Sequence, residues 1–192
     1  MRGLLCVCGI ASLLLLASCD GPACWDIPQA RIYVPLRGQE ESLWCWAACG
    51  AMCMEPTLPV AQCDEVNKYL GRNDCCNQPR PAACNHTGWP PFEAYNFLYI
   101  KRGTPLDYTE LRTEIACKSG PVIFQWVWPG GGSHVMVATG FDINGGNLIF
   151  YNDPAPTGMG SYAITNYGDY VSIPGHHTHG SDYYDIRPKP AD

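Results

Sequence analysis

The chain has 192 residues, with 12 basic against 18 acidic side chains and a formal net charge of −6. No stripe of basic residues offers a surface for nucleic acid, so a nucleic-acid partner has no electrostatic support. The length suits one domain with a substantial core, or two small lobes that share a cleft.

The first 18 residues have the pattern of a signal peptide. Arg2 precedes an apolar run from Leu4 to Leu16, which is too short to span a bilayer as a helix. The run ends in Leu-Ala-Ser-Cys19, which resembles the lipobox of bacterial lipoproteins and implies cleavage before Cys19 and a lipid anchor on it. An ordinary signal peptide is the alternative. We expect a lipid-anchored protein in the periplasm or at the cell surface, with residues 19–33 as a tether.

Cysteine content supports an oxidising compartment. Nine cysteines remain when Cys19 is set aside for lipid: Cys24, Cys45, Cys49, Cys53, Cys63, Cys75, Cys76, Cys84 and Cys117. An odd number in such a compartment indicates a free thiol. We therefore expect four disulfides and one free cysteine. Because Cys75 and Cys76 are adjacent, each is expected to pair elsewhere.

Helical patterns dominate the chain up to about residue 119. The segments with helical spacing of apolar residues or helix boundary signals are 44–54, 60–70, 91–99 and 106–117. Gly71 is a stop signal for the second segment, and Asp107 is a cap for the last.

Strand patterns follow from about residue 120, at 121–128, 134–142, 147–152, 162–165 and 183–186. Asn144-Gly145 predicts a two-residue hairpin turn between the second and third strands. Helices followed by antiparallel strands predict an α+β fold. We place a helical lobe at about 40–119 and a strand lobe at about 120–187.

The predicted hairpin brings an imidazole near a carboxylate. A turn at Asn144-Gly145 puts His134 opposite Ala155, and Asp153 is then its diagonal neighbour on the same face, roughly 7–8 Å away. A carboxylate on one ring nitrogen fixes the tautomer and leaves the other nitrogen free to act on a nucleophile. Asn152 is the alternative third member, although strand alternation sends it to the opposite face.

Cys45 is the candidate nucleophile. It stands at the predicted start of a helix, where backbone N–H groups and the helix dipole stabilise a thiolate. Cys49 and Cys53 lie deeper in the helix and are expected in disulfides. A spacing of four residues separates helical Cβ atoms by roughly 5–6 Å, so Cys45 is not expected to bond to Cys49.

These segments resemble the active site of papain-like cysteine peptidases. The resemblance rests on Gln39 six residues before Cys45-Trp46, on His134, and on the pair Asp153-Pro154. It extends over roughly residues 34–165 and is strongest to compact bacterial members, such as effector proteases and the leader-removing peptidase domains of bacteriocin exporters.

The resemblance implies a papain-like domain over residues 34–192, with its active site in the cleft between the two lobes. It also implies roles: Cys45 as nucleophile, His134 as base, Asp153 as the third triad member and Gln39 as oxyanion donor. One departure is that Ser42-Leu-Trp44 stands where papain has Cys-Gly-Ser, so no disulfide pairing is transferred.

The sequence therefore predicts a cysteine peptidase that acts on a protein or peptide substrate. A cysteine-type cell-wall amidase or endopeptidase, an acyltransferase and an inactive disulfide-rich binding module are the alternatives. No cofactor is indicated. His176, His177 and His179 offer three ligands in what we expect to be a solvated tail, whereas zinc needs about four, so no metal is expected. The oligomeric state is open, with a monomer as the expectation.

Overall fold

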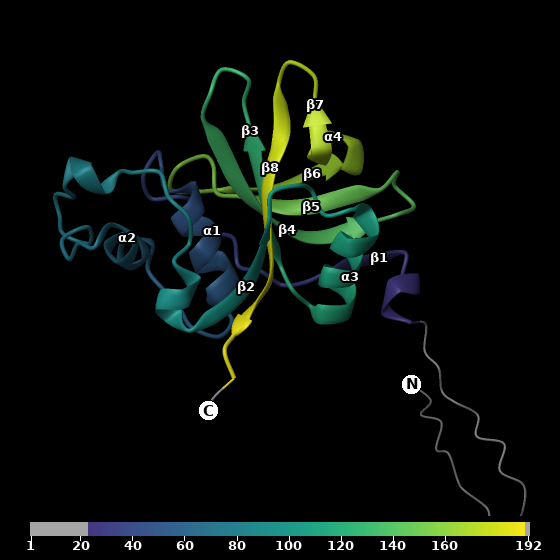
Figure 1. Ribbon diagram of the computed structural model, residues 1–192, viewed down its shortest axis with the longest axis horizontal. Coiled ribbons are helices and arrows are strands. Elements are labelled where there is room, and N and C mark those ends of the chain that lie inside the picture. Colours follow the sequence, from purple (N-terminus) through teal and green to yellow (C-terminus); the bar gives the residue numbers. More distant parts are fainter. Residues whose placement is uncertain (1–22, 191–192) are drawn as a thin grey trace, which may run out of the picture.

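The computed structural model describes residues 23–190, which form an eight-stranded sheet with helices on both sides (Figure 1). The strand order is β2-β8-β3-β4-β5-β6, with β1 paired to β4 and β7 paired to β8, and the paired strands are antiparallel. The predicted α+β class is confirmed. The predicted signal peptide and the lipid site at Cys19 lie outside the described residues.

The elements have the following bounds. The helices are α1 (Cys45–Met54), α2 (Gln62–Leu70), α3 (Tyr108–Lys118) and α4 (Tyr167–Val171). The strands are β1 (Gln29–Arg31), β2 (Phe97–Arg102), β3 (Val122–Val127), β4 (Ser133–Asp142), β5 (Leu148–Asp153), β6 (Ser161–Asn166), β7 (Ser172–Ile173) and β8 (His177–Pro188). Within residues 23–190, no helix has the length and apolar character needed to cross a membrane.

Alternate residues of the central strands contribute to two separate hydrophobic cores. In β4, Val135 and Val137 belong to the core that contains α1, whereas Met136 and Ala138 belong to the core that contains α3. A sheet covered on both faces needs apolar residues on both. This explains why β4 is a nearly continuous apolar run and not an alternating one.

Helix α1 is almost wholly buried, from Trp46 to Met54. It packs closely on α2, because a Cβ atom at Gly50 would lie only 2.1 Å from Oε2 of Glu65. Burial raises the pKa of Glu65 well above its usual range, with the backbone of Ala51 opposing the shift. The helix that begins at Cys45 is thus held by packing along its whole length.

Predicted helix boundaries are confirmed at two positions. Asp107 is the N-cap of α3, where it forms a capping box with Glu110. Gly71 ends α2 in the left-handed conformation. Both residues act through local backbone hydrogen bonds or backbone conformation, which is why the sequence alone was sufficient.

The prediction of a helix at 91–99 is wrong. Only Phe92–Tyr95 is helical, as a single 3-10 turn, and Asn96 then adopts a positive φ of 58°. Strand β2 follows and pairs with β8. The helical lobe therefore contributes a strand to the sheet, and α4 lies within the predicted strand lobe.

Part of the predicted tether belongs to the folded domain. Cys24 is bonded to Cys117 at the end of α3, and Gln29–Arg31 forms β1 beside β4. These contacts hold residues 24–31 against α3 and the sheet, whereas a tether would have no such contacts.

The disulfide prediction is also wrong in number. Residues 23–190 contain three disulfides, Cys24–Cys117, Cys63–Cys76 and Cys75–Cys84. Cys45, Cys49 and Cys53 are free. The expected separate partners of Cys75 and Cys76 are confirmed, but Cys49 and Cys53 are not in disulfides.

Candidate active site

Cys45 is the first residue of α1 and is partly exposed. The two flanking tryptophans hold the first turn through hydrogen bonds to one neighbouring segment. The indole of Trp44 donates to the Cys84 carbonyl (2.7 Å), and the indole of Trp46 donates to the His86 carbonyl (3.0 Å). Both indoles are fully buried, so the cysteine between them has a fixed position and its own backbone N–H at a helix N-terminus.

His134 and Asp153 lie side by side on β4 and β5. Nε2 of His134 is 2.6 Å from Oδ1 of Asp153, and this carboxylate oxygen also accepts a hydrogen bond from the amide of Ala155 (2.8 Å). The Cys45 side chain lines the same cleft and contributes to the raised pKa of His134. Because Asp153 occupies Nε2, Nδ1 is the nitrogen available to the sulfur.

The β4–β5 hairpin has the predicted residue pairing near His134, but its turn differs from the predicted one. Asp142 pairs with Leu148, so the turn contains five residues and not two. An irregularity between Ala138 and Gly140 then shifts the register by one residue. Beyond it, Val137 pairs with Asn152, as a two-residue turn would require. The turn prediction is wrong, but the bulge restores the register that brings His134 to Asp153.

The electrostatics of His134 favour its protonated form. Burial by itself lowers the pKa, but hydrogen bonds to Asp153 and Cys45 and attraction to their negative charges outweigh burial and raise the pKa of His134 from 6.5 to about 9. An imidazolium paired with a carboxylate is a stable arrangement at neutral pH.

Asn152 points away from this group. Its side chain is buried and its amide donates to the Val34 carbonyl at 2.9 Å. Strand alternation therefore places Asn152 in the core on the α1 side and Asp153 beside His134, as expected from the period of two.

Gln39 lies in the same cleft, on the segment that leads to α1. Its amide nitrogen donates to the carbonyls of Glu41 (3.0 Å) and Ser42 (2.9 Å). Donation to a substrate oxygen would require the amide to exchange one of these acceptors. Among the described residues, Oε1 of Gln39 has no hydrogen-bond partner.

The backbone of Gln39 is joined to the segment that follows Asp153. Its N–H donates to the Pro154 carbonyl (2.9 Å), and its carbonyl accepts from Gly158 (2.8 Å). A Cβ atom at Gly38 would lie 2.4 Å from the amide nitrogen of Met159, so only glycine permits this approach. Backbone hydrogen bonds and close packing therefore join the segment of Gln39, the predicted oxyanion donor, to the segment that follows Asp153, the predicted triad acid.

These residues line a cleft of about 920 Å³. Its walls come from the α1 side, including Trp46 and Tyr69, and from the sheet, including Gln125 and Val135.

Trp128 adds a residue to the predicted set, because its ring stacks on His134 with 6.3 Å between centroids. Its sequence position, just before a glycine run and His134, was the available signal.

The two remaining free cysteines are inert core residues. Cys49 is fully buried and donates to the Val135 carbonyl at 3.3 Å. Burial raises the pKa of the Cys49 thiol well above its usual range, and that of the Cys53 thiol as well. Their burial within α1 explains why these two residues remain thiols that pack as small apolar side chains.

The histidines near the C-terminus do not form a solvated tail. His177 is buried in β8, stacks on Trp126 with 4.0 Å between centroids, and has Nε2 at 2.7 Å from the Asp169 carbonyl. His179 lies 2.9 Å from the buried carboxylate of Asp182. These side chains stabilise the packing of β8 on α4.

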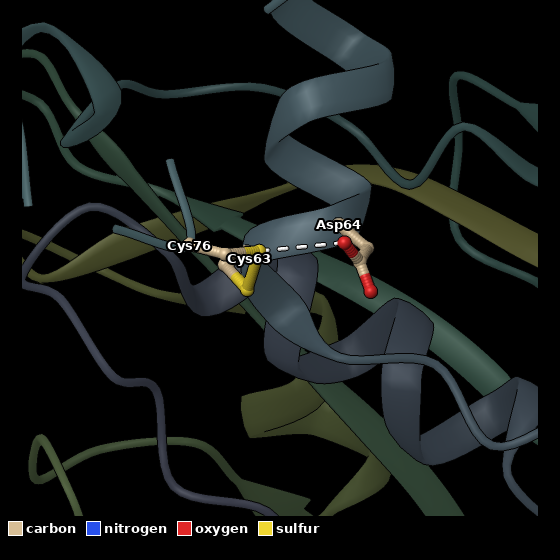
Figure 2. A group of neighbouring side chains, drawn as sticks. All are labelled: Cys63, Asp64 and Cys76. Carbon is tan, nitrogen blue, oxygen red and sulfur yellow. Dashed lines mark hydrogen bonds between the residues drawn. A yellow bond between two sulfur atoms is a disulfide. The ribbon is translucent and has the colours of Figure 1, made fainter. Parts of the chain in front are cut away.

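A second group of potential metal ligands is occupied by a covalent bond. Figure 2 shows Cys63 and Cys76 joined in a disulfide, with Oδ1 of Asp64 at 3.3 Å from the Cys76 sulfur. Disulfide sulfurs are not thiolates, so one carboxylate is the only conventional ligand in this group.

The raised pKa of His134 predicts a pH-dependent contribution to stability. The folded value exceeds 6.5, so the stabilisation is complete below that pH and is lost as the pH rises through about 9. We expect His134→Gln to lose roughly 3 kcal/mol more unfolding free energy at about pH 6 than at about pH 9.5. Urea unfolding across this range measures the difference.

His86→Gln is the matched control, because His86 lines the same cleft without contacting Asp153. This variant should keep the wild-type pH dependence. A pH dependence unchanged by His134→Gln would contradict the prediction.

The comparisons with known proteins agree with this geometry. Residues 28–171, more than half of the chain, match the family described as papain-like cysteine protease AvrRpt2. The structure is similar to the peptidase domain of Streptococcus ComA, a bi-functional ABC transporter involved in a quorum-sensing pathway, with a TM-score of 0.52 and 14% sequence identity. The match covers 82% of this chain and 100% of that domain. None of the curated proteins that were compared matches the chain.

The ComA domain has the same papain-like architecture, and the predicted papain-like fold is confirmed. The matched residues include the segment around Cys45, strands β4 and β5 and most of the two cores. The chain belongs to the papain-like cysteine proteases of the AvrRpt2 family.

Proposed function

We propose that this peptidase cleaves peptide bonds with Cys45, His134 and Asp153 as its catalytic triad. The observation that carries the proposal is that Asp153 binds one nitrogen of His134, while Cys45 lines the same cleft and contributes to the raised pKa of that ring. These three residues line a cleft large enough for several side chains of a peptide.

The mechanism follows from these positions. The Cys45 thiolate attacks the scissile carbonyl carbon and forms a tetrahedral intermediate. The backbone N–H of Cys45 stabilises the oxyanion, and the Gln39 amide would do so after exchanging one carbonyl acceptor. His134 protonates the leaving amine. Water, deprotonated by the same imidazole, then releases the acid product from the acyl-enzyme.

We further propose that the reaction takes place outside the cytoplasm. The three disulfides support an oxidising compartment, because reducing systems keep cytosolic cysteines as thiols. The signal-peptide pattern before Cys19 supports export and a lipid anchor, and metabolic labelling with a fatty-acid analogue would test the anchor.

Substrate class can be tested directly. The purified protein is incubated with casein and, separately, with purified peptidoglycan, and newly formed amines are counted. Release from casein alone supports a peptidase, whereas release from peptidoglycan alone indicates a cell-wall amidase or endopeptidase. Product formation that rises with an added amine indicates acyl transfer. No product from any substrate would leave an inactive binding module.

The oxyanion role of Gln39 gives a specific prediction. Gln39→Ala is expected to lower kcat by roughly 10²–10³-fold, because that is the usual loss for one oxyanion donor. Gln39→Glu keeps the length of the side chain but loses the N–H donor, so it should be no better. Steady-state kinetics on a peptide substrate measures both variants.

Gln29→Ala provides the control, since Gln29 is exposed on β1. It should keep wild-type kcat. If Gln39→Glu also kept wild-type kcat, donation by the amide would be ruled out.

A further inference from the structure

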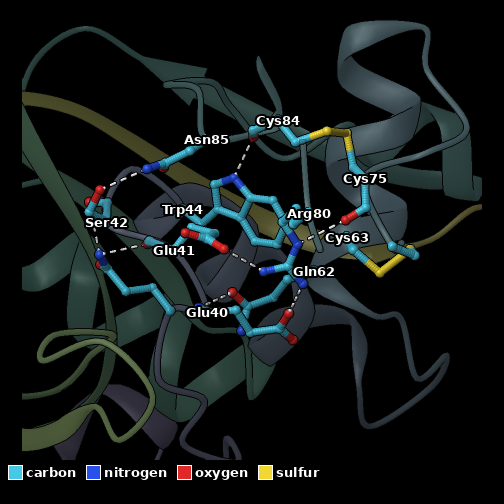
Figure 3. A network of polar contacts seen from close by, with 12 residues as sticks. Glu40, Glu41, Ser42, Trp44, Gln62, Cys63, Cys75, Arg80, Cys84 and Asn85 are labelled. Carbon is cyan, nitrogen blue, oxygen red and sulfur yellow. Dashed lines mark hydrogen bonds and ion pairs between the residues drawn. A yellow bond between two sulfur atoms is a disulfide. The ribbon is translucent and has the colours of Figure 1, made fainter. Parts of the chain in front are cut away.

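Five residues connect Gln39 to Cys45, and we name them the linker 40–44. A short segment closed by the Cys75–Cys84 disulfide, residues 75–85, lies against this linker (Figure 3). Every linker residue contacts the 75–85 segment. The contacts are Glu40 and Glu41 with Arg80, Ser42 and Leu43 with Asn85, and Trp44 with Arg80 and Cys84.

Arg80 makes three of these six contacts. One guanidinium nitrogen lies 2.8 Å from a Glu41 oxygen, and another lies 2.8 Å from a Glu40 oxygen. Nε donates to the Cys75 carbonyl at 2.9 Å, and the guanidinium carbon lies 4.3 Å from the centre of the Trp44 ring. The Arg80 side chain is only 13% exposed. Its planar fork therefore fills a built site between the two segments.

Asn85 fixes the middle of the linker. Its Oδ1 accepts from the backbone N–H of Leu43 (3.0 Å), and its Nδ2 donates to the Ser42 hydroxyl (2.9 Å). The Trp44 indole bonds to the Cys84 carbonyl. Thus the two residues that close the disulfide both offer carbonyls to this network, one to Arg80 and one to Trp44.

The linker in turn fixes both ends of the candidate catalytic segment. The Gln39 amide donates to the carbonyls of Glu41 and Ser42, which belong to residues held by Arg80 and Asn85. Trp44 is the N-cap residue of α1, so its position sets where Cys45 begins the helix. A shift of Arg80 would therefore move the proposed oxyanion donor and the nucleophile together.

We propose that Arg80 is a positioning residue for the reaction, acting through Glu41 and Trp44 to hold Gln39 and Cys45 in their relative places. The proposal rests on the proposed function. Arg80 does not line the cleft, so it would act without touching the substrate. Ion pairs to the exposed carboxylate of Glu40 and the partly exposed carboxylate of Glu41 contribute little stability by themselves. A displacement of about 1 Å at a reacting group, in contrast, can cost roughly 10²-fold in rate.

The test uses Arg80→Ala, Arg80→Lys and the control Arg72→Ala. Arg72 is paired with Asp74 beside the same segment but makes no contact with the linker. We expect Arg80→Ala to lower kcat by about 10²-fold with a much smaller change in KM. Arg80→Lys should be intermediate, because an ammonium keeps the charge but cannot bind two carboxylates and stack on Trp44. Arg72→Ala should match the wild type.

A double-mutant cycle separates positioning from general stability. If Arg80 acts through Gln39, Arg80→Ala should cost much less kcat in a Gln39→Ala background than in the wild type. If the loss of kcat in the double variant equalled the product of the losses in the two single variants, the proposal would be overturned. The proposal would also be overturned if the Arg80→Ala variant folds and its kcat lies within about twofold of the wild type. For this comparison, kcat is calculated per mole of reactive Cys45, as determined by thiol titration.

Two further measurements keep the test decisive. If Arg80→Ala does not fold, Glu41→Gln weakens the same link and must lower kcat, since an unchanged kcat would overturn the proposal. The rate of Cys45 alkylation by iodoacetamide is measured in parallel. If the wild type cleaves no peptide, the proposed function fails, and equal alkylation rates in wild type and Arg80→Ala would separately overturn the positioning role.

Discussion

Replacement of Cys45 by alanine is expected to abolish peptide hydrolysis while leaving the fold intact. Loss of the nucleophile of a triad costs on the order of 10⁶-fold in turnover in a serine protease. Among residues 23–190, neither of the other free thiols is placed to replace Cys45. Cys49 lies one turn further along α1, but it is buried against the Val135 carbonyl and burial raises the pKa of its thiol. It therefore stays protonated and unreachable.

Cys49→Ala is the matched control for this prediction. It removes a thiol from the same helix and leaves Cys45 and His134 in contact. We expect it to cost some stability through a small cavity, but to keep kcat within a few-fold of the wild type. Peptide cleavage and thermal unfolding are measured for both variants. Substantial cleavage by Cys45→Ala would exclude this residue as the nucleophile.

Much of the candidate site could be predicted because its determinants are local. Cys45 starts a helix, and strand alternation separates Asp153 from Asn152. The pairing of His134 with Asp153 was predicted correctly from a wrong turn, since the five-residue loop after Asp142 and the irregularity near Gly140 compensate each other. Such compensation depends on packing across the sheet and leaves no local signal.

Other features could not be predicted because they depend on contacts between distant segments. Strand β2 follows a left-handed Asn96 and exists because β8 provides an edge for pairing. His177 was expected in a solvated tail, but β8 buries it against Trp126. In the same way, the pairing of Cys75 with Cys84 places Arg80 on the linker 40–44, and sequence spacing alone does not reveal that contact.

Asp153→Ala is expected to lower kcat/KM by roughly 10³–10⁴-fold and to change its pH dependence. The carboxylate holds Nε2 of His134 at 2.6 Å, which leaves Nδ1 as the nitrogen free to act on Cys45. Disruption of this link in a serine-protease triad costs about 10⁴-fold. Asp153→Asn should show a loss of the same order, because its amide oxygen can still accept from Nε2 but provides no negative charge for the imidazolium.

The pH profile distinguishes this role from a structural one. With the pKa of His134 raised to about 9, wild-type kcat/KM should stay high up to that pH and fall above it as the general acid is deprotonated. Without the Asp153 charge, this decline should begin at lower pH in both variants, and Asp153→Ala lacks the hydrogen bond as well.

Asn152→Ala supplies the control for the Asp153 variants. Its amide supports the Val34 carbonyl in the core, so its loss should reduce stability. It should leave the basic limb of the profile at the wild-type pH, because Asn152 does not contact His134. If the basic limb of Asp153→Asn also stayed there, Asp153 would not be the residue that raises the pKa of His134, and the proposed triad would lose its third member.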